Sequence, residues 1–161
     1  MYYLNYFFIF SIIGHILETF VYHNGESGIL FGPWTPVYGI GVIIISLIHL
    51  FLDKTSKNKI TKPLLLFILS SIILTLIEAI GGYLIEYLFH ITFWDYSYLK
   101  FHIGKYIALE MSLVWGISSI VVIYVLKPFI DKIIGKIPKY LTYILTILII
   151  IDFICTLIIK H

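Results

Sequence analysis

Residues 63–89 read PLLLFILSSIILTLIEAIGGYLIEYLF. A helix that crosses the hydrocarbon core of a bilayer needs about 20 mostly apolar residues, so this segment is long enough to span with tilt or to protrude. Four further stretches qualify by the same measure: residues 2–22, 36–52, 105–126 and 140–159. The sequence therefore predicts an all-α fold, a polytopic transmembrane helical bundle of about five spans.

Composition supports a membrane protein over a soluble one. The chain has 161 residues, of which 60% are hydrophobic and 12% charged, and its mean hydropathy is +1.02. A soluble domain of this size cannot bury so much apolar surface. We expect residues 1–161 to form a single membrane domain. We find no soluble linker, no low-complexity tract and no convincing internal repeat, and the N-terminus lacks the positive region of a signal peptide.

The basic residues predict the orientation of the chain. All of them are Lys, the net charge is only +2, and they form no basic stripe, so we expect no nucleic-acid partner. Most lie in two loops, between the second and third spans and between the fourth and fifth. By the positive-inside rule these loops and the N-terminus are cytoplasmic, in a multi-pass membrane protein. The loop residues are Lys54, Lys57, Lys59, Lys62, Lys127, Lys132, Lys136 and Lys139.

On this topology most acidic residues fall in or above the outer half of the bilayer. A lone charge in hydrocarbon costs about 3 kcal/mol even on lenient insertion scales, so we expect the acids to face one another, His or Lys, or a water-filled cavity. Helical spacing supports this, because His15 and Glu18 share one polar stripe and Glu78 and Glu86 share another with Gly82. Such stripes also serve helix packing. The acids are Glu18, Glu78, Glu86, Glu110 and Asp152 within spans, and Glu26 and Asp95 in outer loops.

The two outer loops carry the most distinctive residues. The first contains Phe-Gly-Pro-Trp-Thr-Pro at residues 31–36, and the second contains Phe-Trp-Asp-Tyr-Ser-Tyr at residues 93–98. Their aromatic side chains suit the bilayer interface. They also suit a gate or mouth above an acidic pocket, where aromatic rings stack on a cation. We predict that role for Trp34, Tyr38, Trp94 and Tyr96.

An ordered set of motifs resembles a known bacterial family. The set comprises Gly14-x-x-x-Glu18, Phe31-Gly32-Pro33-x-x-Pro36-x-Tyr38-Gly39-x-Gly41, Glu86-Tyr87, Trp94-Asp95-Tyr96-Ser97, Phe101 and Leu109-x-x-Ser112-Leu113-x-Trp115-Gly116. It resembles the family described as putative ABC-transporter type IV, or ABC-transporter permease, from about residue 14 to residue 128. Many members have a Phe-Asn-x-x-Gly-Arg segment where this chain has Phe101-His102-Ile103-Gly104-Lys105. Lys in place of Arg supplies a point charge and cannot form the two parallel hydrogen bonds of a guanidinium group.

The resemblance implies a transport component of the bacterial cytoplasmic membrane, and three functions stay open. The first is a permease-like protein whose outer, acid-lined pocket binds a small solute, with cations among the candidates, a metal or protons. The second is an intramembrane enzyme acting on a lipid or lipid-linked substrate, with His15 and Glu18 as base and orienter or as metal ligands. The third is a non-catalytic scaffold or sensor. The predicted pocket residues are His15, Glu18, Glu78, Glu86, Asp95, His102, Lys105 and Glu110.

The absence of certain motifs from the sequence bears on the expected cofactors and partners. No GxxxxGK[ST] loop is present, so ATP would act only through a separate ATPase chain docked on the cytoplasmic loops. No HExxH or GxSxG signature points to an enzyme, and neither catalytic residues nor metal ligands are assigned from the sequence. The expected partners are the lipid bilayer, such an ATPase subunit and a second copy of the chain.

Overall fold

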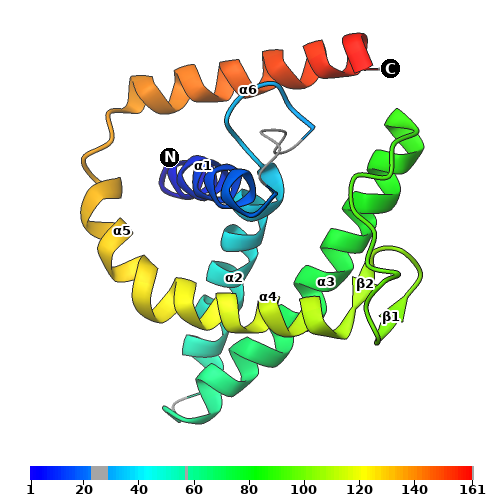
Figure 1. The fold of residues 1–161 in the computed structure, drawn as a ribbon. Coiled ribbons are helices and arrows are strands. Elements are labelled where there is room, and N and C mark those ends of the chain that lie inside the picture. Colours follow the sequence, from blue (N-terminus) through cyan, green and yellow to red (C-terminus); the bar gives the residue numbers. More distant parts are fainter. Residues whose placement is uncertain (23–28, 57, 161) are drawn as a thin grey trace. The chain divides into compact units, whose positions relative to one another are not determined.

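The computed structural model describes residues 1–22, 29–56 and 58–160, so Glu26 and Lys57 lie outside the described residues. Helices dominate this part of the chain, and a single two-stranded antiparallel sheet lies between α3 and α4 (Figure 1). The elements in order are α1 (Tyr2–Tyr22), α2 (Pro36–Thr55), α3 (Thr61–Phe89), β1 (His102–Ile103), β2 (Ile107–Ala108), α4 (Leu109–Val121), the π-helical segment η1 (Val122–Leu126), α5 (Lys127–Ile134) and α6 (Lys139–Lys160).

The predicted fold class is confirmed. Within the described residues, five helices are long and apolar enough to cross a membrane. They are Tyr2–Phe20, Pro36–Thr55, Thr61–Phe89, Leu109–Ile134 and Lys139–Ile159. Their apolar side chains remain largely exposed because lipid, and not protein, is their intended environment. The protein is therefore a multi-pass membrane protein.

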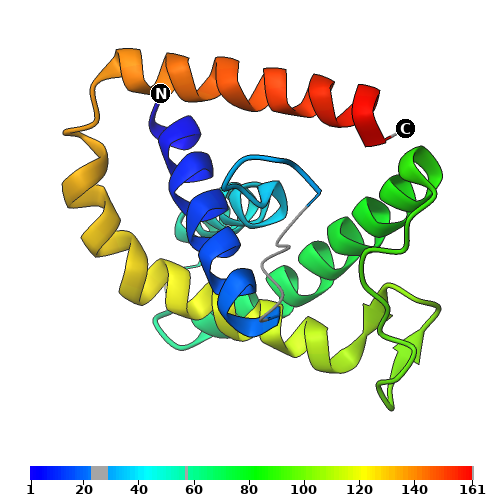
Figure 2. The same ribbon diagram turned by 45° about the horizontal axis from the view of Figure 1, so that its top comes forward.

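The fourth span differs most from its predicted bounds. Residues 105–108 are not helical, because Gly104 adopts a left-handed conformation with φ 63° and turns the chain back into a hairpin. In that hairpin His102 pairs with Ala108 and Ile103 with Ile107. The helix begins at Leu109 and continues through η1 into α5, so that Lys127 and Lys132 lie on a helix and not in a loop. Figure 2 shows the hairpin beside the first turn of α4.

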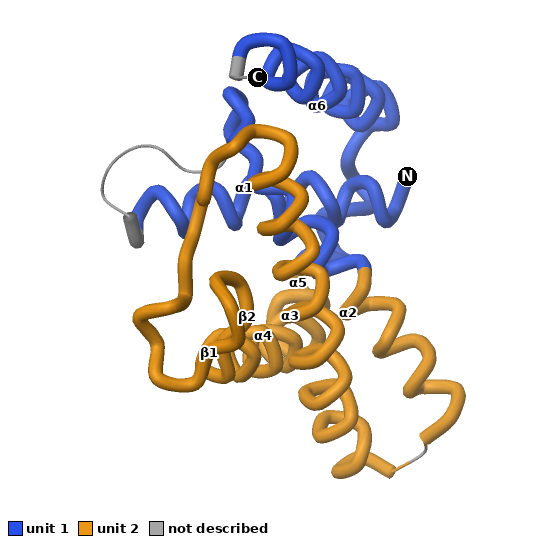
Figure 3. Tube along the Cα trace, turned by 90° about the vertical axis from the view of Figure 1, so that its right-hand side faces the viewer, with its two compact units in different colours: residues 1–43, 130–161 blue, residues 44–129 orange. Residues whose placement is uncertain are grey.

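The chain divides into two compact units (Figure 3). Unit 1 comprises residues 1–43 and 130–161, and unit 2 comprises residues 44–129. In unit 1, buried polar side chains join helices: Thr142 of α6 donates a 2.6 Å hydrogen bond to Asn5 of α1. The hydroxyls of Tyr2 and Tyr6 each donate a 2.6 Å bond to Asp131 of α5.

In unit 2, α3 and α4 form the main helix pair, and small residues set their spacing. A Cβ atom built on Gly116 of α4 would lie 2.6 Å from the Phe67 ring of α3, and it would also overlap the Ser71 hydroxyl. Thr75 of α3 donates a 2.8 Å hydrogen bond to Ser112 of α4. Close backbone approach and interhelical hydrogen bonds are the usual means of helix association in lipid.

Candidate functional site

The central residue of the candidate site is Glu78, a buried carboxylate on α3 with 7% of its surface exposed. It accepts a 2.7 Å hydrogen bond from the Tyr96 hydroxyl and another of 2.7 Å from the Trp115 indole N–H. Trp115 lies on α4, one residue before the glycine that contacts α3. The close approach of the two helices therefore brings the indole to the carboxylate.

Tyr96 reaches Glu78 because the loop after α3 folds back over the helix pair. Its backbone N–H donates a 2.7 Å bond to the Lys105 carbonyl, and only 7% of the residue is exposed. The neighbouring Asp95 closes a tight turn by accepting hydrogen bonds from the hydroxyl and the backbone N–H of Ser97. These two bonds hold the pKa of Asp95 below its usual value.

A second carboxylate, Glu86, lies two turns farther along α3 in an ion pair. Lys105 donates to it at 2.5 Å and the Tyr106 hydroxyl donates at 2.9 Å. The bond to Glu86 raises the pKa of Lys105. Burial, followed by the same kind of bond to Glu86, raises the pKa of Tyr106. The Tyr106 ring contacts Gly82 and meets the rings of Tyr83 and Trp94 edge-on.

The two carboxylates differ in electrostatics. Within the described part of the chain, no Lys or His nitrogen lies within 4.0 Å of the Glu78 carboxylate, whose partners are both neutral. Glu86, in contrast, has a Lys as its closest partner. A charged group in a low-dielectric setting needs a counter-charge, which Glu86 finds in the protein and Glu78 does not.

The other predicted residues of unit 2 lie around this network. Glu110, in the first turn of α4, accepts a 3.4 Å bond from the Phe101 backbone, and its second oxygen is buried with no hydrogen-bond partner among the described residues. The Trp94 indole N–H is likewise buried with no hydrogen-bond partner among the described residues. His102 is exposed on the hairpin, with Nδ1 2.8 Å from the Leu99 carbonyl.

The remaining predicted residues belong to unit 1. Glu18 accepts a 3.4 Å bond from the Thr35 hydroxyl, and the His15 carbonyl accepts one from Thr19. The Tyr38 ring packs against Gly14. Trp34 is buried, with 6% of its surface exposed. In unit 2 the structure thus joins Glu78 to Tyr96 and Glu86 to Lys105. In unit 1 it places Glu18 against Thr35, Trp34 against Asp152 and Tyr38 against Gly14.

One residue in unit 1 has a role that the sequence did not reveal. Asp152 of α6 accepts bonds from the backbone N–H groups of Phe31, at 2.9 Å, and Gly32, at 2.8 Å. The Trp34 indole N–H adds a third at 2.6 Å. Asp152 therefore fixes the loop that precedes α2. These three partners lie more than a hundred residues away from Asp152 along the chain, so the local sequence contains no signal for this contact.

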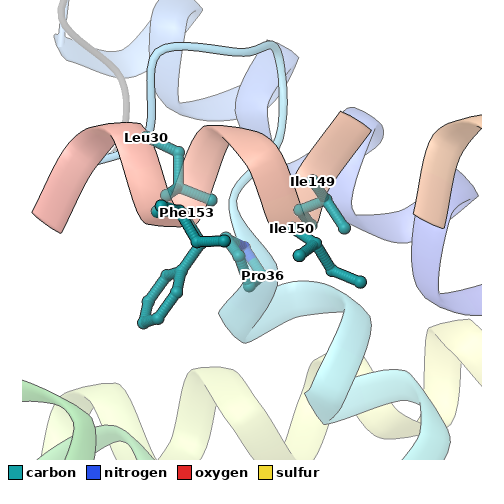
Figure 4. A pocket seen from close by; sticks show the side chains of 6 residues that line it. Leu30, Pro36, Ile149, Ile150 and Phe153 are labelled. Carbon is teal, nitrogen blue, oxygen red and sulfur yellow. The ribbon is translucent and has the colours of Figure 1, made fainter. Parts of the chain in front are cut away.

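Beside this loop lies an apolar groove of about 320 Å³ on α6 (Figure 4). Only apolar side chains line it, including Leu30 and Pro36 from the loop region and Phe153 from α6. The groove contains none of the predicted acids. Among the described residues, no group of three or more His, Cys, Asp and Glu side chains is arranged to hold a metal ion.

Comparisons with known proteins identify the family but add no characterised relative. Neither the curated proteins nor the solved structures include a match to this chain. The model of the family described as putative ABC-transporter type IV matches residues 5–160, almost the whole chain. This match confirms the resemblance seen in the motifs of the helix ends and loops. The chain therefore belongs to the putative ABC-transporter type IV family and is an ABC-transporter-related membrane protein.

Proposed function

We propose that this protein is the membrane-embedded, permease-like component of a transporter, and that the Glu78 carboxylate binds a proton or a small cationic solute. The observation that carries the proposal is the setting of Glu78: a carboxylate buried in a membrane-crossing helix, with two neutral hydrogen-bond donors. Intramembrane acids with this surrounding are costly unless their charge is neutralised.

A proton or a cation supplies the missing counter-charge. The Tyr96 hydroxyl and the Trp115 N–H each occupy one carboxylate oxygen, which leaves the remaining lone pairs for a ligand. The carboxylate itself favours a proton or a cation over an anion, because it is the charged group at the site. On the predicted orientation Glu78 lies in the outer half of the bilayer, near its midplane.

Glu86 has a different role in this proposal. It follows Glu78 by eight residues, which is about 12 Å along a helix axis. Its charge is already balanced by Lys105, which also places the hairpin over the end of α3. We therefore assign Glu86 and Lys105 to holding the hairpin and the Tyr96 loop above the site, while Glu78 contacts the ligand.

The partners of the transporter follow from the family and from the sequence. The chain contains no nucleotide-binding loop of the P-loop type, so ATP hydrolysis would take place on a separate ATPase chain. The Lys-rich segments at residues 54–62 and 127–139 are the proposed docking surface, on the side predicted to be cytoplasmic. A second copy of the chain would complete a transport path, since five spans enclose little space.

Carbodiimide labelling tests the Glu78 site directly. Dicyclohexylcarbodiimide reacts with protonated carboxyl groups in apolar surroundings, and mass spectrometry of the purified full chain locates the modified residue. We expect modification at Glu78 at neutral pH and none at Glu86, whose Lys105 partner keeps it a carboxylate. Unmodified Glu78 between pH 6 and pH 8, with the reagent active on a control protein, would overturn the proposed site.

Transport itself is tested in proteoliposomes. The purified chain is reconstituted with an internal pH-sensitive dye, and a potassium diffusion potential drives proton entry. We expect dye acidification above that of empty liposomes, lost in Glu78→Gln and kept in Glu86→Gln. Equal rates for wild type and Glu78→Gln would contradict a role for this carboxylate in transport.

A further inference from the structure

Unit 2 holds a histidine that has no part in the Glu78 site. His49 lies near the end of α2, and its Nε2 is 3.4 Å from the carboxylate of Asp53, one turn farther along the helix. That carboxylate also accepts a 2.7 Å bond from Lys62, at the start of α3. The His49 ring meets the Tyr124 ring of η1 edge-on, with their centroids 6.0 Å apart. The histidine therefore lies where α2, the start of α3 and η1 meet.

Asp53 determines which nitrogen of His49 is able to take up a proton. A carboxylate only accepts hydrogen bonds, so its position favours the neutral tautomer with the hydrogen on Nε2. The lone pair then lies on Nδ1, which is buried and has no hydrogen-bond partner among the residues that the structure describes. Buried polar atoms are rarely left unpaired. Nδ1 of His49 is thus a proton acceptor inside the protein, on a side chain that exchanges protons near neutral pH.

Buried hydroxyl groups lie between Glu78 and the start of α3. Thr75 and Ser71 precede Glu78 by three and seven residues, so they share its face of the helix. Both are buried, and the neighbouring Ser70 is buried completely. The hydroxyls of Ser70 and Ser71 have no hydrogen-bond partner in the described chain. Unpaired hydroxyls are the polar partners that a bridging water molecule needs.

The facing helix α4 continues this line of hydroxyls toward the histidine. Its Gly116 lies so close to Ser71 that a Cβ on the glycine would overlap that hydroxyl. Ser119 is buried completely and donates a 2.6 Å bond to the Gly116 carbonyl. Tyr124, which contacts His49, follows Ser119 by five residues, within η1. Short π-helical segments within α-helices are frequent at functional sites.

We infer that a proton path follows the interface of α3 and α4 from Glu78 to His49, and that His49 exchanges the proton with water at its far end. The inference rests on the proposed function and names its ligand as a proton. The path spans the sixteen residues of α3 from Glu78 back to Lys62, about 24 Å along the helix axis. On the predicted orientation it ends on the cytoplasmic side.

The exchange at His49 conserves protons and charge. Nδ1 takes up the arriving proton and the ring becomes an imidazolium. Nε2 then releases its own proton to water beside Asp53, whose side chain is 44% exposed. Movement of the remaining proton from Nδ1 to Nε2, by a turn of the ring or through water, restores the starting tautomer. The charged groups that face the ring in the described structure are Asp53 and, through it, Lys62.

Proton entry into proteoliposomes tests the far end of the path. His49→Gln keeps a polar side chain beside Asp53 but carries no proton at neutral pH, so we expect its rate to fall at least about tenfold. Dicyclohexylcarbodiimide modification of Glu78 should stay at the wild-type level in this variant. A wild-type rate in His49→Gln, with Glu78 modified, would overturn the path and leave the proposed function standing. Absence of Glu78 modification in the wild-type chain would overturn the proposed function itself.

Chemical rescue separates proton transfer from a structural role of His49. His49→Ala removes the ring, and imidazole at equal concentration on both membrane faces supplies a mobile proton carrier. We expect imidazole to raise the proton entry rate of His49→Ala by about threefold or more, after subtraction of the rate in empty liposomes. Glu78→Gln should not respond, because its defect lies at the other end of the path. A His49→Ala rate that imidazole leaves unchanged would overturn proton exchange by His49.

Removal of a single hydroxyl tests the middle of the path. Ser71→Ala should lower the proton entry rate about fivefold, because one hydrogen-bonding step is lost. Its melting temperature should not fall, since the hydroxyl that is removed makes no bond to the described residues. Ser118→Ala is the matched control, because Ser118 is only half-buried and lies on a different side of α4 from Ser119. Equal rates for the two variants would contradict a path past Ser71.

Discussion

The indole N–H of Trp34 donates a 2.6 Å hydrogen bond to Asp152, and both side chains are buried. Because Phe31, Gly32 and Thr156 also donate to this carboxylate, Asp152→Ala removes the acceptor of four hydrogen bonds. We expect this variant to lose about 3 kcal/mol of unfolding free energy or more. Trp34→Phe removes one donor and should cost about 1 kcal/mol. Equilibrium unfolding in mixed micelles measures both, and a change below about 0.5 kcal/mol for Asp152→Ala would contradict the anchoring role.

Two adjacent glycines of α3 should respond in opposite directions to the same substitution. A Cβ on Gly82 would lie 2.6 Å from the Tyr106 ring, whereas one on Gly81 meets no atom within 4 Å. Gly82→Ala should therefore destabilise the chain by about 1–3 kcal/mol through overpacking. Gly81→Ala should be neutral or stabilise it by up to about 1 kcal/mol, since Ala favours a helix. Thermal unfolding of the two variants in parallel checks the prediction, and equal effects would contradict it.

The pair of Glu86 and Lys105 should be coupled weakly and in a pH-dependent way. Because Lys105 is 45% exposed on its side chain, a double-mutant cycle of thermal unfolding with Glu86→Gln and Lys105→Met should give a small coupling that added salt reduces. The pKa of Lys105 is raised, so the coupling is fully present below the ordinary Lys value of about 10.4 and disappears as pH rises through the folded value. Coupling that grows with pH in that range would contradict the ion pair.

The Tyr96 hydroxyl should influence the reactivity of Glu78. A hydrogen bond to a carboxylate favours its charged form, so Tyr96→Phe should increase carbodiimide modification of Glu78, by roughly fivefold for a bond of about 1 kcal/mol. Tyr98→Phe is the matched control, because Tyr98 is 80% exposed. Equal modification of Glu78 in the two variants would contradict the bond between Tyr96 and Glu78.

The spans could be predicted because their signal is local. A run of about 20 apolar residues is visible in the sequence whatever its neighbours are, and the predicted first and third spans end at Tyr22 and Phe89, as α1 and α3 do. The start of the fourth span was wrong because the left-handed turn at Gly104 and the pairing of β1 with β2 interrupt an otherwise apolar stretch. Hydropathy does not distinguish such a hairpin from the first turn of a helix.

The site was harder to predict because its contacts join distant residues. The spacing predicted that Glu78 and Glu86 lie on one polar face of a helix. Nothing in the local sequence indicates that Glu86 pairs with Lys105 while Glu78 accepts bonds from two neutral donors. The bonds from Phe31, Gly32 and Trp34 to Asp152 could not be predicted either, because these residues are distant from Asp152 in the sequence.

The last turn of α3 ends at His90, a non-glycine residue in the left-handed region with φ 55°. Its N–H bonds to the carbonyl of Glu86, whose carboxylate holds Lys105 and Tyr106. Glu86 thus joins the end of α3, through its backbone carbonyl, to the following hairpin, through its carboxylate. Fraying of that terminus and release of the hairpin are consequently one cooperative event, and hydrogen exchange of their amides should proceed at a common rate.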